Sequence, residues 1–343
     1  GGTGTNHIML GFGDDLWYSD GNGNATTPPS NQIENPDPQP GTNNWYTQDG
    51  YSGGTYSNCS DPTQPGVTAI VSYLGSLPYK PKPNCDPNHY YILNNYAPGY
   101  FGDGSVNKGT FVIPPSPVRS IGDELLQANI SWRYYGEGWE TYLGDPNFNN
   151  PLDTYCDICN PFQYSTSIMT NAAVRQNNLK DVTDLYNDIN DGFLPAVSYV
   201  KPGFLLDGHP ASSKLDLFEG FVRKIVDLVQ GNEELWEHTA IVVTFDETGG
   251  YWDSGYIQPV DFFGDGPRIP TIVISPYSKG GHVVHDYYDH VSVLKFIEKN
   301  WGLSPITGRS RDNLPNPVTT KSNPYVPTNS PAIGDLTGMF NFK

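Results

Sequence analysis

The central apolar run of the chain is Ala240–Phe245, which ends abruptly at Asp246 and Glu247 and is followed by Gly249 and Gly250. The run is too short for an ordinary helix and is rich in β-branched residues, so it predicts a strand that is buried on both faces. The two acids then fall at its carboxyl end. Loops at that edge of an open α/β sheet bind ligands, because the sheet holds them rigidly while their sequences vary.

Other segments alternate between helical and strand patterns. The predicted strands are Ile130–Tyr135, Leu194–Val200 and the run after Arg268 up to Tyr277. Four helices are also predicted. The first begins at a capping box at Ser120, and the second runs through Val182, Leu185 and Ile189. The third extends from a cap at Ser212 or Ser213 to a stop at Gly231, and the fourth follows a cap at Asp289, with Val291, Leu294 and Ile297 facing inward. This alternation predicts an α/β sheet, in which the strands at Leu194 and Ala240 are joined by a right-handed crossover if they are parallel.

No clean linker divides the 343 residues, so we expect one domain. Residues 1–302 are predicted to form the catalytic portion. Residues 303–343 are rich in Pro and Asn without periodicity, which predicts an ordered tail that wraps the surface of the same domain.

The formal net charge of -18 argues against nucleic acid and anionic membrane surfaces as partners, because both would repel the chain. No apolar run approaches the roughly 20 residues that cross a bilayer. The abundant Gly, Pro, Asn and Tyr predict long ordered loops on a rigid scaffold, and the low Lys content favours a secreted or periplasmic protein.

Four cysteines allow three complete pairings. The simplest joins Cys59 to Cys85 and Cys156 to Cys159. A Cys-x-x-Cys pair can also be redox-active or bind zinc, although no second pair or neighbouring His completes a zinc site here. Structural disulfides fit an exported chain better than free thiols do.

The glycine-rich start of the chain carries two hydroxyl nucleophile candidates, Thr3 and Thr5, and Asn6 is a donor that could hold a phosphoryl oxygen. A flexible terminus is the alternative reading, and no Gly-Lys-Ser/Thr follows to make a nucleotide P-loop. Near the predicted edge, His209 sits in a turn after the Leu194 strand, where an imidazole can act as acid, base or ligand. The alternative is that His209 has no catalytic role and is a surface residue or a hydrogen-bonded structural residue.

The adjacent acids Asp246 and Glu247 repel each other unless a cation or donors offset them, so a divalent metal is their natural partner. An acidic turn after a core strand is the alternative. Arg268 could pair with phosphate or with an acidic neighbour, and three more His follow it in a short stretch, at His282, His285 and His290.

Four stretches together resemble the bacterial phosphoesterase family, which contains non-haemolytic phospholipases C and a respiratory-burst-inhibiting acid phosphatase and has the alkaline-phosphatase-like fold. They are Asp207–Pro210, Trp236–Gly250, Arg268–Tyr277 and Asp289–Glu298. The similarity is ordered and extends from Gly1 to about Gly302. It implies a three-layer α/β/α sandwich around a mostly parallel sheet.

The resemblance also implies roles for individual residues. Thr3 would be the nucleophile, Asn6 would bind the substrate, His209 would assist the leaving group, and Asp246 and Glu247 would bind a divalent metal. Metal contact would lower the pKa of the hydroxyl, and a covalent phosphothreonine would then be hydrolysed by water.

The sequence departs from the family pattern in three places. Family members carry a Glu-Asn pair in an N-terminal strand, which these 343 residues lack. Asp253-Ser-Gly stands where many members have Asp-His-Val, and Cys159 stands where some have His. We therefore expect an incomplete sheet, a weakened metal site, and an N-terminal fragment of the same polypeptide as a partner, with this chain a cleaved product or part of a longer one.

The leading expectation is a metal-dependent phosphoric ester hydrolase that acts on phosphate esters or phospholipids. The alternative is a structural or binding protein on the same scaffold that has lost catalysis.

Overall fold

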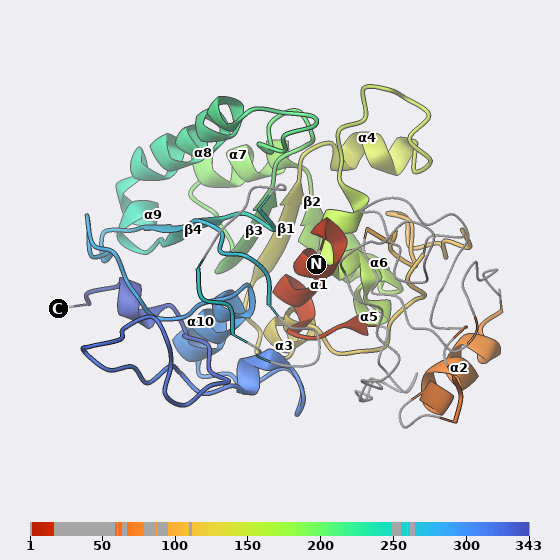
Figure 1. The fold of residues 1–343 in the computed structure, drawn as a ribbon. Coiled ribbons are helices and arrows are strands. Elements are labelled where there is room, and N and C mark those ends of the chain that lie inside the picture. Colours follow the sequence, from red (N-terminus) through yellow and green to blue (C-terminus); the bar gives the residue numbers. More distant parts are fainter. Residues whose placement is uncertain are drawn as a thin grey trace.

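The computed structural model describes residues 2–16, 59, 61–63, 67–78, 87, 95–109, 112–248, 255–258, 260 and 265–342. Gly249, Gly250, Asp253 and Cys85, to which the sequence drew attention, lie outside this set. Within it the chain is a mixed α/β protein with a small parallel sheet (Figure 1).

Five strands form two sheets in the described residues. β1 (Trp132–Gly136) lies between β2 (Leu179–Lys180) and β3 (Val197–Lys201), and all three are parallel. β4 (Ile241–Thr244) pairs with β5 (Thr271–Ile274) in antiparallel register. The strands predicted around residues 130, 194, 240 and 270 are therefore confirmed as elements.

Two predictions about these strands are wrong. β3 and β4 do not lie in one sheet, as the predicted crossover between them required, because β4 takes its hydrogen bonds from β5. The four residues of β4 are also only half-buried, although the apolar run predicted burial on both faces. One cause accounts for both differences: the edges of β3 and β4 line a common cavity in place of pairing with each other.

The helices connect and cover these strands. They are α1 (Thr3–Phe12), α2 (Val67–Ser76), α3 (Ile121–Gln127), α4 (Trp139–Gly144), α5 (Thr166–Met169), α6 (Ala172–Asn178), α7 (Val182–Asn190), α8 (Leu215–Gln230), α9 (Glu233–Glu237) and α10 (Val291–Trp301), with short 3-10 turns η4 (Asp157–Cys159), η5 (Pro161–Tyr164), η6 (Arg311–Asn313) and η7 (Thr337–Met339).

Local capping signals explain where several helices begin. Ser120 and Asp123 form the predicted capping box of α3. The Asp289 carboxylate accepts a 2.8 Å hydrogen bond from the Val291 N–H at the start of α10. The predicted serine cap of α8 is wrong: Lys214 occupies that position, and the Ser213 hydroxyl donates to the Leu205 carbonyl instead.

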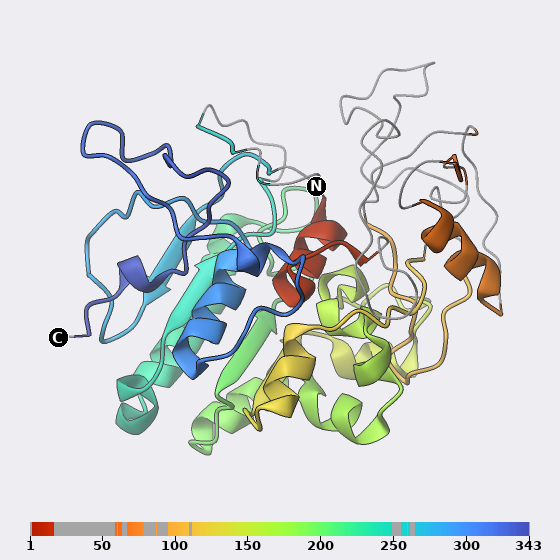
Figure 2. The same ribbon diagram turned by 90° about the horizontal axis from the view of Figure 1, so that it is seen from below.

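Helices lie on both sides of the parallel sheet (Figure 2). Trp132 and Tyr134 of β1 belong to a core cluster that includes residues of α3 and α10. The alternate residue Tyr135 belongs to a second cluster with α7 and α8, as expected for side chains that point to opposite faces of a strand. β1 is therefore buried on both faces.

α1 packs closely on η5 because Gly11 has no side chain. A Cβ at Gly11 would lie 2.5 Å from the Cβ of Pro161. The helix ends at Gly13, whose φ of 63° is left-handed and suits glycine. This close contact fixes the direction in which the first turn of α1 points.

The cysteines are oxidised in the described residues. Cys156 and Cys159 form a disulfide, as predicted, and Cys59 is also disulfide-bonded. Cys59's predicted partner lies outside the described residues.

The tail after residue 303 contributes to the core as well as to the surface. Ile306, Ile333 and Leu336 are buried. The Lys295 ammonium of α10 donates to the carbonyls of Leu314 and Ile333, both at 2.6 Å. The tail therefore supplies side chains to the core of the fold.

Three buried carboxyl groups meet where α3, α10 and η6 converge. Glu124, Glu298 and Asp312 are all at most 6% exposed, and each has one oxygen without a hydrogen-bond partner in the described part of the chain. Burial first, then the contact with Asp312 and the charges around it, raises the pKa of Glu298 to about 9. Glu298 is therefore protonated at neutral pH.

We expect Glu298→Gln to flatten the pH dependence of stability. The folded state retains a proton that the unfolded carboxyl, with a pKa of 4.5, releases, so wild-type stability declines as pH rises toward about 9. Glutamine keeps a donor without a titrating proton. Melting curves recorded across this pH range give the free energy of unfolding. As pH rises, the variant's free energy of unfolding should increase relative to that of wild type by more than about 1 kcal/mol. The exposed control Glu219→Gln should follow wild type, and parallel curves for Glu298→Gln would contradict the assignment.

Candidate active site

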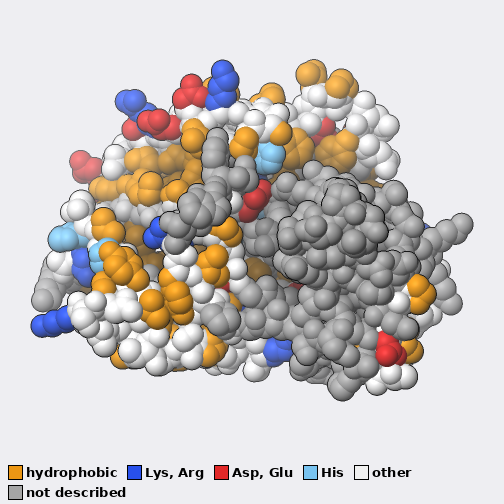
Figure 3. Space-filling model, viewed as in Figure 1, with side chains coloured by type: hydrophobic (Ala, Val, Ile, Leu, Met, Phe, Trp, Pro, Cys, Tyr) orange, Lys and Arg blue, Asp and Glu red, His pale blue; other side chains and the backbone are white. Residues whose placement is uncertain are grey.

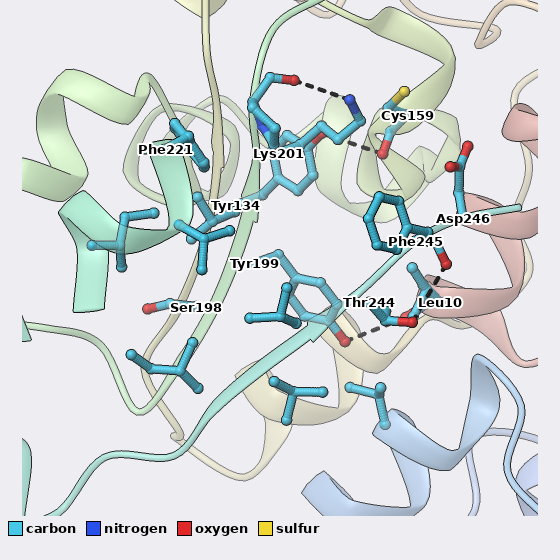
Figure 4. Close-up of a pocket in the computed structure, with 18 of the residues that line it drawn as sticks. Leu10, Tyr134, Cys159, Ser198, Tyr199, Lys201, Phe221, Thr244, Phe245 and Asp246 are labelled. Carbon is cyan, nitrogen blue, oxygen red and sulfur yellow. Dashed lines mark hydrogen bonds between the residues drawn. The ribbon is translucent and has the colours of Figure 1, made fainter. Parts of the chain in front are cut away.

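Four of the five residues predicted for the site line a cavity of about 1410 Å³. Thr3, His209, Asp246 and Glu247 all line it, together with Lys201. Lys201 ends β3 and Asp246 follows β4, so the site lies at the carboxyl ends of both strands (Figure 4). On the face seen in Figure 3, hydrophobic side chains gather in a band beside α8 and β4.

Thr3 and Asp246 are directly connected. The Thr3 side chain hydrogen-bonds to the Asp246 carboxylate, which can only accept, so the hydroxyl donates. Burial tends to raise the pKa of Asp246, but the attraction of His7 and Lys201 and the Thr3 hydrogen bond together hold it below its ordinary value. Asp246 is thus ionised, and it fixes the orientation of the Thr3 oxygen.

The first turn of α1 presents Thr3 to the cavity. Gly2 is the extended N-cap residue, and the Asn95 side-chain oxygen accepts a 3.0 Å hydrogen bond from the Gly4 N–H. Asn95 lines the cavity too. A helix N-terminus carries partial positive charge, which favours an anion beside Thr3.

His7 is a site residue that the sequence analysis missed. It lies one turn after Thr3 on the same face of α1, and its Nδ1 is 2.9 Å from the Thr3 carbonyl and 3.8 Å from the Asp246 carboxylate. Burial lowers the pKa of His7 to about 4, so the ring is neutral at pH 7. Since a carbonyl only accepts, Nδ1 carries the hydrogen. The spacing Thr3-x-x-x-His7 was the available signal.

Lys201 is a second residue without a predicted role. Its ammonium donates to the Pro202 carbonyl at 3.0 Å and lies 3.5 Å from the Asp207 carboxylate. Burial lowers its pKa, while Asp207 and Asp246 counteract that effect. Its place at the end of a predicted strand was the signal that could have identified it. A cation here can attract an anionic substrate despite the acidic chain.

His209 is held in a defined tautomer. Its backbone N–H donates to the Asp207 carboxylate at 2.9 Å, and its Nδ1 accepts a 3.1 Å bond from the Ala211 N–H. An accepting Nδ1 carries no hydrogen, so the neutral ring has its hydrogen on Nε2. That N–H is therefore available as a donor in the cavity.

The other candidates are placed differently. Asn6 and Thr5 lie on α1 but are not among the residues that line the cavity. His290 is half-buried next to the site, with Nε2 3.1 Å from the Phe245 carbonyl. His282 and His285 are exposed, whereas Arg268 lines the cavity. Cys159 is in a disulfide and cannot substitute for a histidine.

The described residues supply only part of a metal site. Asp246, Glu247 and the Thr3 hydroxyl offer oxygen donors of the kind that hard divalent cations prefer. However, no group of three or more His, Cys, Asp or Glu residues that could hold a metal occurs among the described residues. The described residues alone do not complete a metal centre.

The phosphoesterase family matches residues 80–304 of the sequence. That match covers more than half of the chain, so the chain belongs to the phosphoesterase family.

Individual relatives are phospholipases and phosphatases. Phospholipase C B of Mycobacterium tuberculosis is 32% identical over 293 residues, covering 75% of this chain and 50% of the relative. The non-hemolytic phospholipase C of Burkholderia pseudomallei is 26% identical over 323 residues (80% and 42%), and the acid phosphatase of Aspergillus niger is 30% identical over 200 residues (57% and 44%). The chain spans about half the length of these relatives or somewhat less.

None of the described helices is both long and apolar enough to cross a membrane.

Proposed function

We propose that this chain carries most of the active site of a metal-dependent phosphoric ester hydrolase that acts through a phosphothreonine intermediate. The observation that carries the proposal is the Thr3 hydroxyl, which projects from the N-terminus of α1 and is held by the ionised Asp246. Nucleophile, carboxylate and a histidine donor then face one cavity.

The chain's own groups suffice to describe the transfer. The Thr3 oxygen attacks phosphorus and its hydroxyl proton passes to water, the ester P–O bond breaks, and the departing alkoxide, which accepts a hydrogen bond from the His209 Nε2–H, takes a proton from water. Water then attacks phosphothreonine and releases phosphate with Thr3 restored. Lys201, which lines the cavity, and the α1 N-terminus attract the phosphoryl oxygens. Asn6 stays a proposed substrate ligand on the strength of the family resemblance, although it is not among the residues that line the cavity.

A divalent metal is part of this proposal. When bound, it would lower the pKa of the Thr3 hydroxyl and polarise a phosphoryl oxygen. Asp246 and Glu247 are the ligands that this chain would contribute. The remaining ligands would come from outside these 343 residues, from an N-terminal fragment of the same polypeptide.

The fold and location of the whole protein are proposals of the same kind. We propose an alkaline-phosphatase-like three-layer α/β/α sandwich, with residues 1–302 in the catalytic domain and 303–343 as its tail. The helices on both sides of the parallel sheet support this. The oxidised cysteines support a secreted or periplasmic protein.

Two substrate classes fit the site. A small phosphate monoester needs only the polar end of the cavity. A phospholipid would also need an apolar approach, and Phe204 (39% exposed) and Leu215 (60% exposed) provide one beside His209, where both line the cavity. Assays of both substrates in parallel would distinguish them.

The function is tested with the full polypeptide and a chromogenic phosphate monoester. We expect hydrolysis that is lost with a chelator and restored by a divalent metal, and a phosphoryl group on Thr3 when the reaction is quenched with acid and analysed by peptide mass spectrometry. Hydrolysis without any phosphorylated Thr3 would refute the covalent route. Absence of hydrolysis of both monoester and phospholipid in the metal-loaded protein would favour the alternative, an inactive binding protein on this scaffold.

A further inference from the structure

The turn between α3 and β1 has the sequence Asn129-Ile130-Ser131. An asparagine that is followed by any residue except proline, and then by serine or threonine, is the acceptor motif for N-linked glycosylation. Asn129 and Ser131 are both exposed. Two further acceptor motifs, at Asn24 and Asn58, lie outside the described residues. The Asn129 motif is therefore complete and lies on the surface of the described fold.

The Asn129 side chain can carry a bulky substituent without breaking a contact. Its backbone N–H donates to the Leu126 carbonyl at 3.1 Å, and the Ile130 N–H donates to the Leu125 carbonyl at 2.9 Å. The side-chain amide makes no hydrogen bond to the described residues. The backbone of the turn is thus fixed, while the side-chain nitrogen faces solvent.

The motif lies at the opposite end of the sheet from the active site. β1 follows the motif and runs parallel to β3, with Gly136 beside Lys201. The five steps from Ser131 to Gly136 span roughly 16 Å, at about 3.3 Å per residue. In Figure 2 the start of the chain, which carries Thr3, lies at the top, and the yellow helix α3 lies toward the bottom. A substituent on Asn129 would leave the catalytic end of the cavity open.

Each motif residue also has a structural use. The φ of Asn129 is 56°, a left-handed conformation that asparagine and glycine adopt readily after a helix. The Ser131 hydroxyl oxygen accepts a 3.0 Å hydrogen bond from the Ala196 N–H. These uses explain the two residues separately, but neither use requires the other residue. The acceptor motif explains their spacing and their shared exposure.

The contacts of Ser131 also set the order of events. Its hydroxyl oxygen bonds to Ala196, and its carbonyl accepts a 3.0 Å hydrogen bond from the Val197 N–H at the start of β3. A glycosyltransferase has to bind the motif's hydroxyl together with the asparagine. That hydroxyl is reachable in the unfolded chain and engaged once β1 and β3 have paired. Glycosylation at Asn129 therefore has to precede the pairing of these strands.

The oxidised cysteines point to the compartment in which this reaction takes place. Cys156 and Cys159 form a disulfide, and Cys59 is also disulfide-bonded. Disulfides form in the lumen of the endoplasmic reticulum, where N-linked glycans are also attached. A chain that folds there meets the transferase before its strands pair.

We propose that Asn129 carries an N-linked oligosaccharide, transferred from a polyisoprenyl diphosphate donor before the chain folds. The Asn129 side-chain nitrogen forms a bond to C1 of the sugar, the C1–O bond to the diphosphate breaks, and the amide proton passes to a base of the transferase. The lipid diphosphate leaves. This modification depends on the secretory location proposed above and not on the phosphatase chemistry.

Mass spectrometry of the full-length polypeptide from its native source tests the proposal directly. The denatured protein is treated with a peptide N-glycosidase in heavy-oxygen water, which converts a glycosylated asparagine to labelled aspartate. The tryptic peptide Ser120–Arg133 should carry the label at Asn129, and the exposed Asn149, which is in no acceptor motif, should not. Unmodified asparagine at position 129 would overturn the proposal, as would equal labelling in a sample without the enzyme.

Variants secreted from yeast separate the glycan from the structural uses of the two residues. Asn129→Gly keeps the left-handed turn and should lose the mass of one glycan, with the melting temperature of the enzymatically deglycosylated wild type. Ser131→Thr keeps the hydroxyl and should retain the glycan. Equal masses for wild type and Asn129→Gly would contradict attachment at this residue. Loss of hydrolytic activity in a folded Asn129→Gly would contradict the placement of the glycan away from the catalytic end.

The order of events has its own test. Full-length protein folded after expression in bacteria is incubated with oligosaccharyltransferase and a lipid-linked oligosaccharide, beside the free Ser120–Arg133 peptide. The peptide should be glycosylated, and the folded protein should remain unmodified at Asn129. Equal modification of the peptide and the folded protein would show that strand pairing does not protect the motif, and would overturn the proposed order.

Discussion

Thr3→Ala should lower kcat/KM for a phosphate monoester by at least about a thousandfold, because it removes the atom that attacks phosphorus. KM should change less than kcat, since Lys201 and the α1 N-terminus still attract the substrate. Thr3→Ser should keep a measurable fraction of activity, as serine supplies the same oxygen. Steady-state kinetics of the metal-loaded full polypeptide would give kcat and KM for wild type, Thr3→Ala and Thr3→Ser.

Thr5→Ala is the matched control for this prediction. Thr5 lies in the same turn of α1 and was an equal candidate from sequence, but it does not line the cavity. Its variant should differ from wild type by less than about threefold, within the range of a surface substitution. If Thr5→Ala loses the activity and Thr3→Ala retains it, the nucleophile has been assigned to the wrong hydroxyl.

Short-range patterns predicted the elements of the fold well. The capping box at Ser120, the stripe of α7 and the β-branched run of β4 each depend on residues that are neighbours in sequence. The partner of β4 could not be predicted in this way. An apolar strand is compatible with several neighbours, and the choice of β5 over β3 depends on what fills the space beside β3.

The site was predicted to a similar extent. Thr3, His209 and the acid pair all line one cavity, and sequence order could anticipate this because loops at the carboxyl ends of strands lie along one edge of a sheet. His7 and Lys201 escaped notice because their roles depend on burial and on distances to Asp246. A histidine within an apolar helix and a lysine at a strand end have no motif of their own.

The ion pair of Arg311 and Asp289 gives the second large effect, this time on stability. The pair is 3.0 Å apart, and its side chains are only 7% and 3% exposed. Arg311→Met would leave the Asp289 carboxylate buried without its cation. We expect the free energy of unfolding to fall by about 3–5 kcal/mol, as is usual when one partner of a buried pair is removed. Urea denaturation of the full polypeptide would measure it.

Arg223→Met is the control, because Arg223 forms an exposed pair with Asp227 (79% and 65% exposed) on α8. Its variant should change stability by no more than about 0.5 kcal/mol. Arg311→Met combined with Asp289→Asn should be less destabilised than the sum of the single variants, since no unpaired charge remains. The Arg311 backbone N–H donates to the Gly13 carbonyl after α1, and the Asp289 carboxylate accepts from the Val291 N–H at the start of α10. The pair therefore joins the tail to both helices. Equal losses for Arg311→Met and Arg223→Met would mean that the tail is held by its apolar contacts alone.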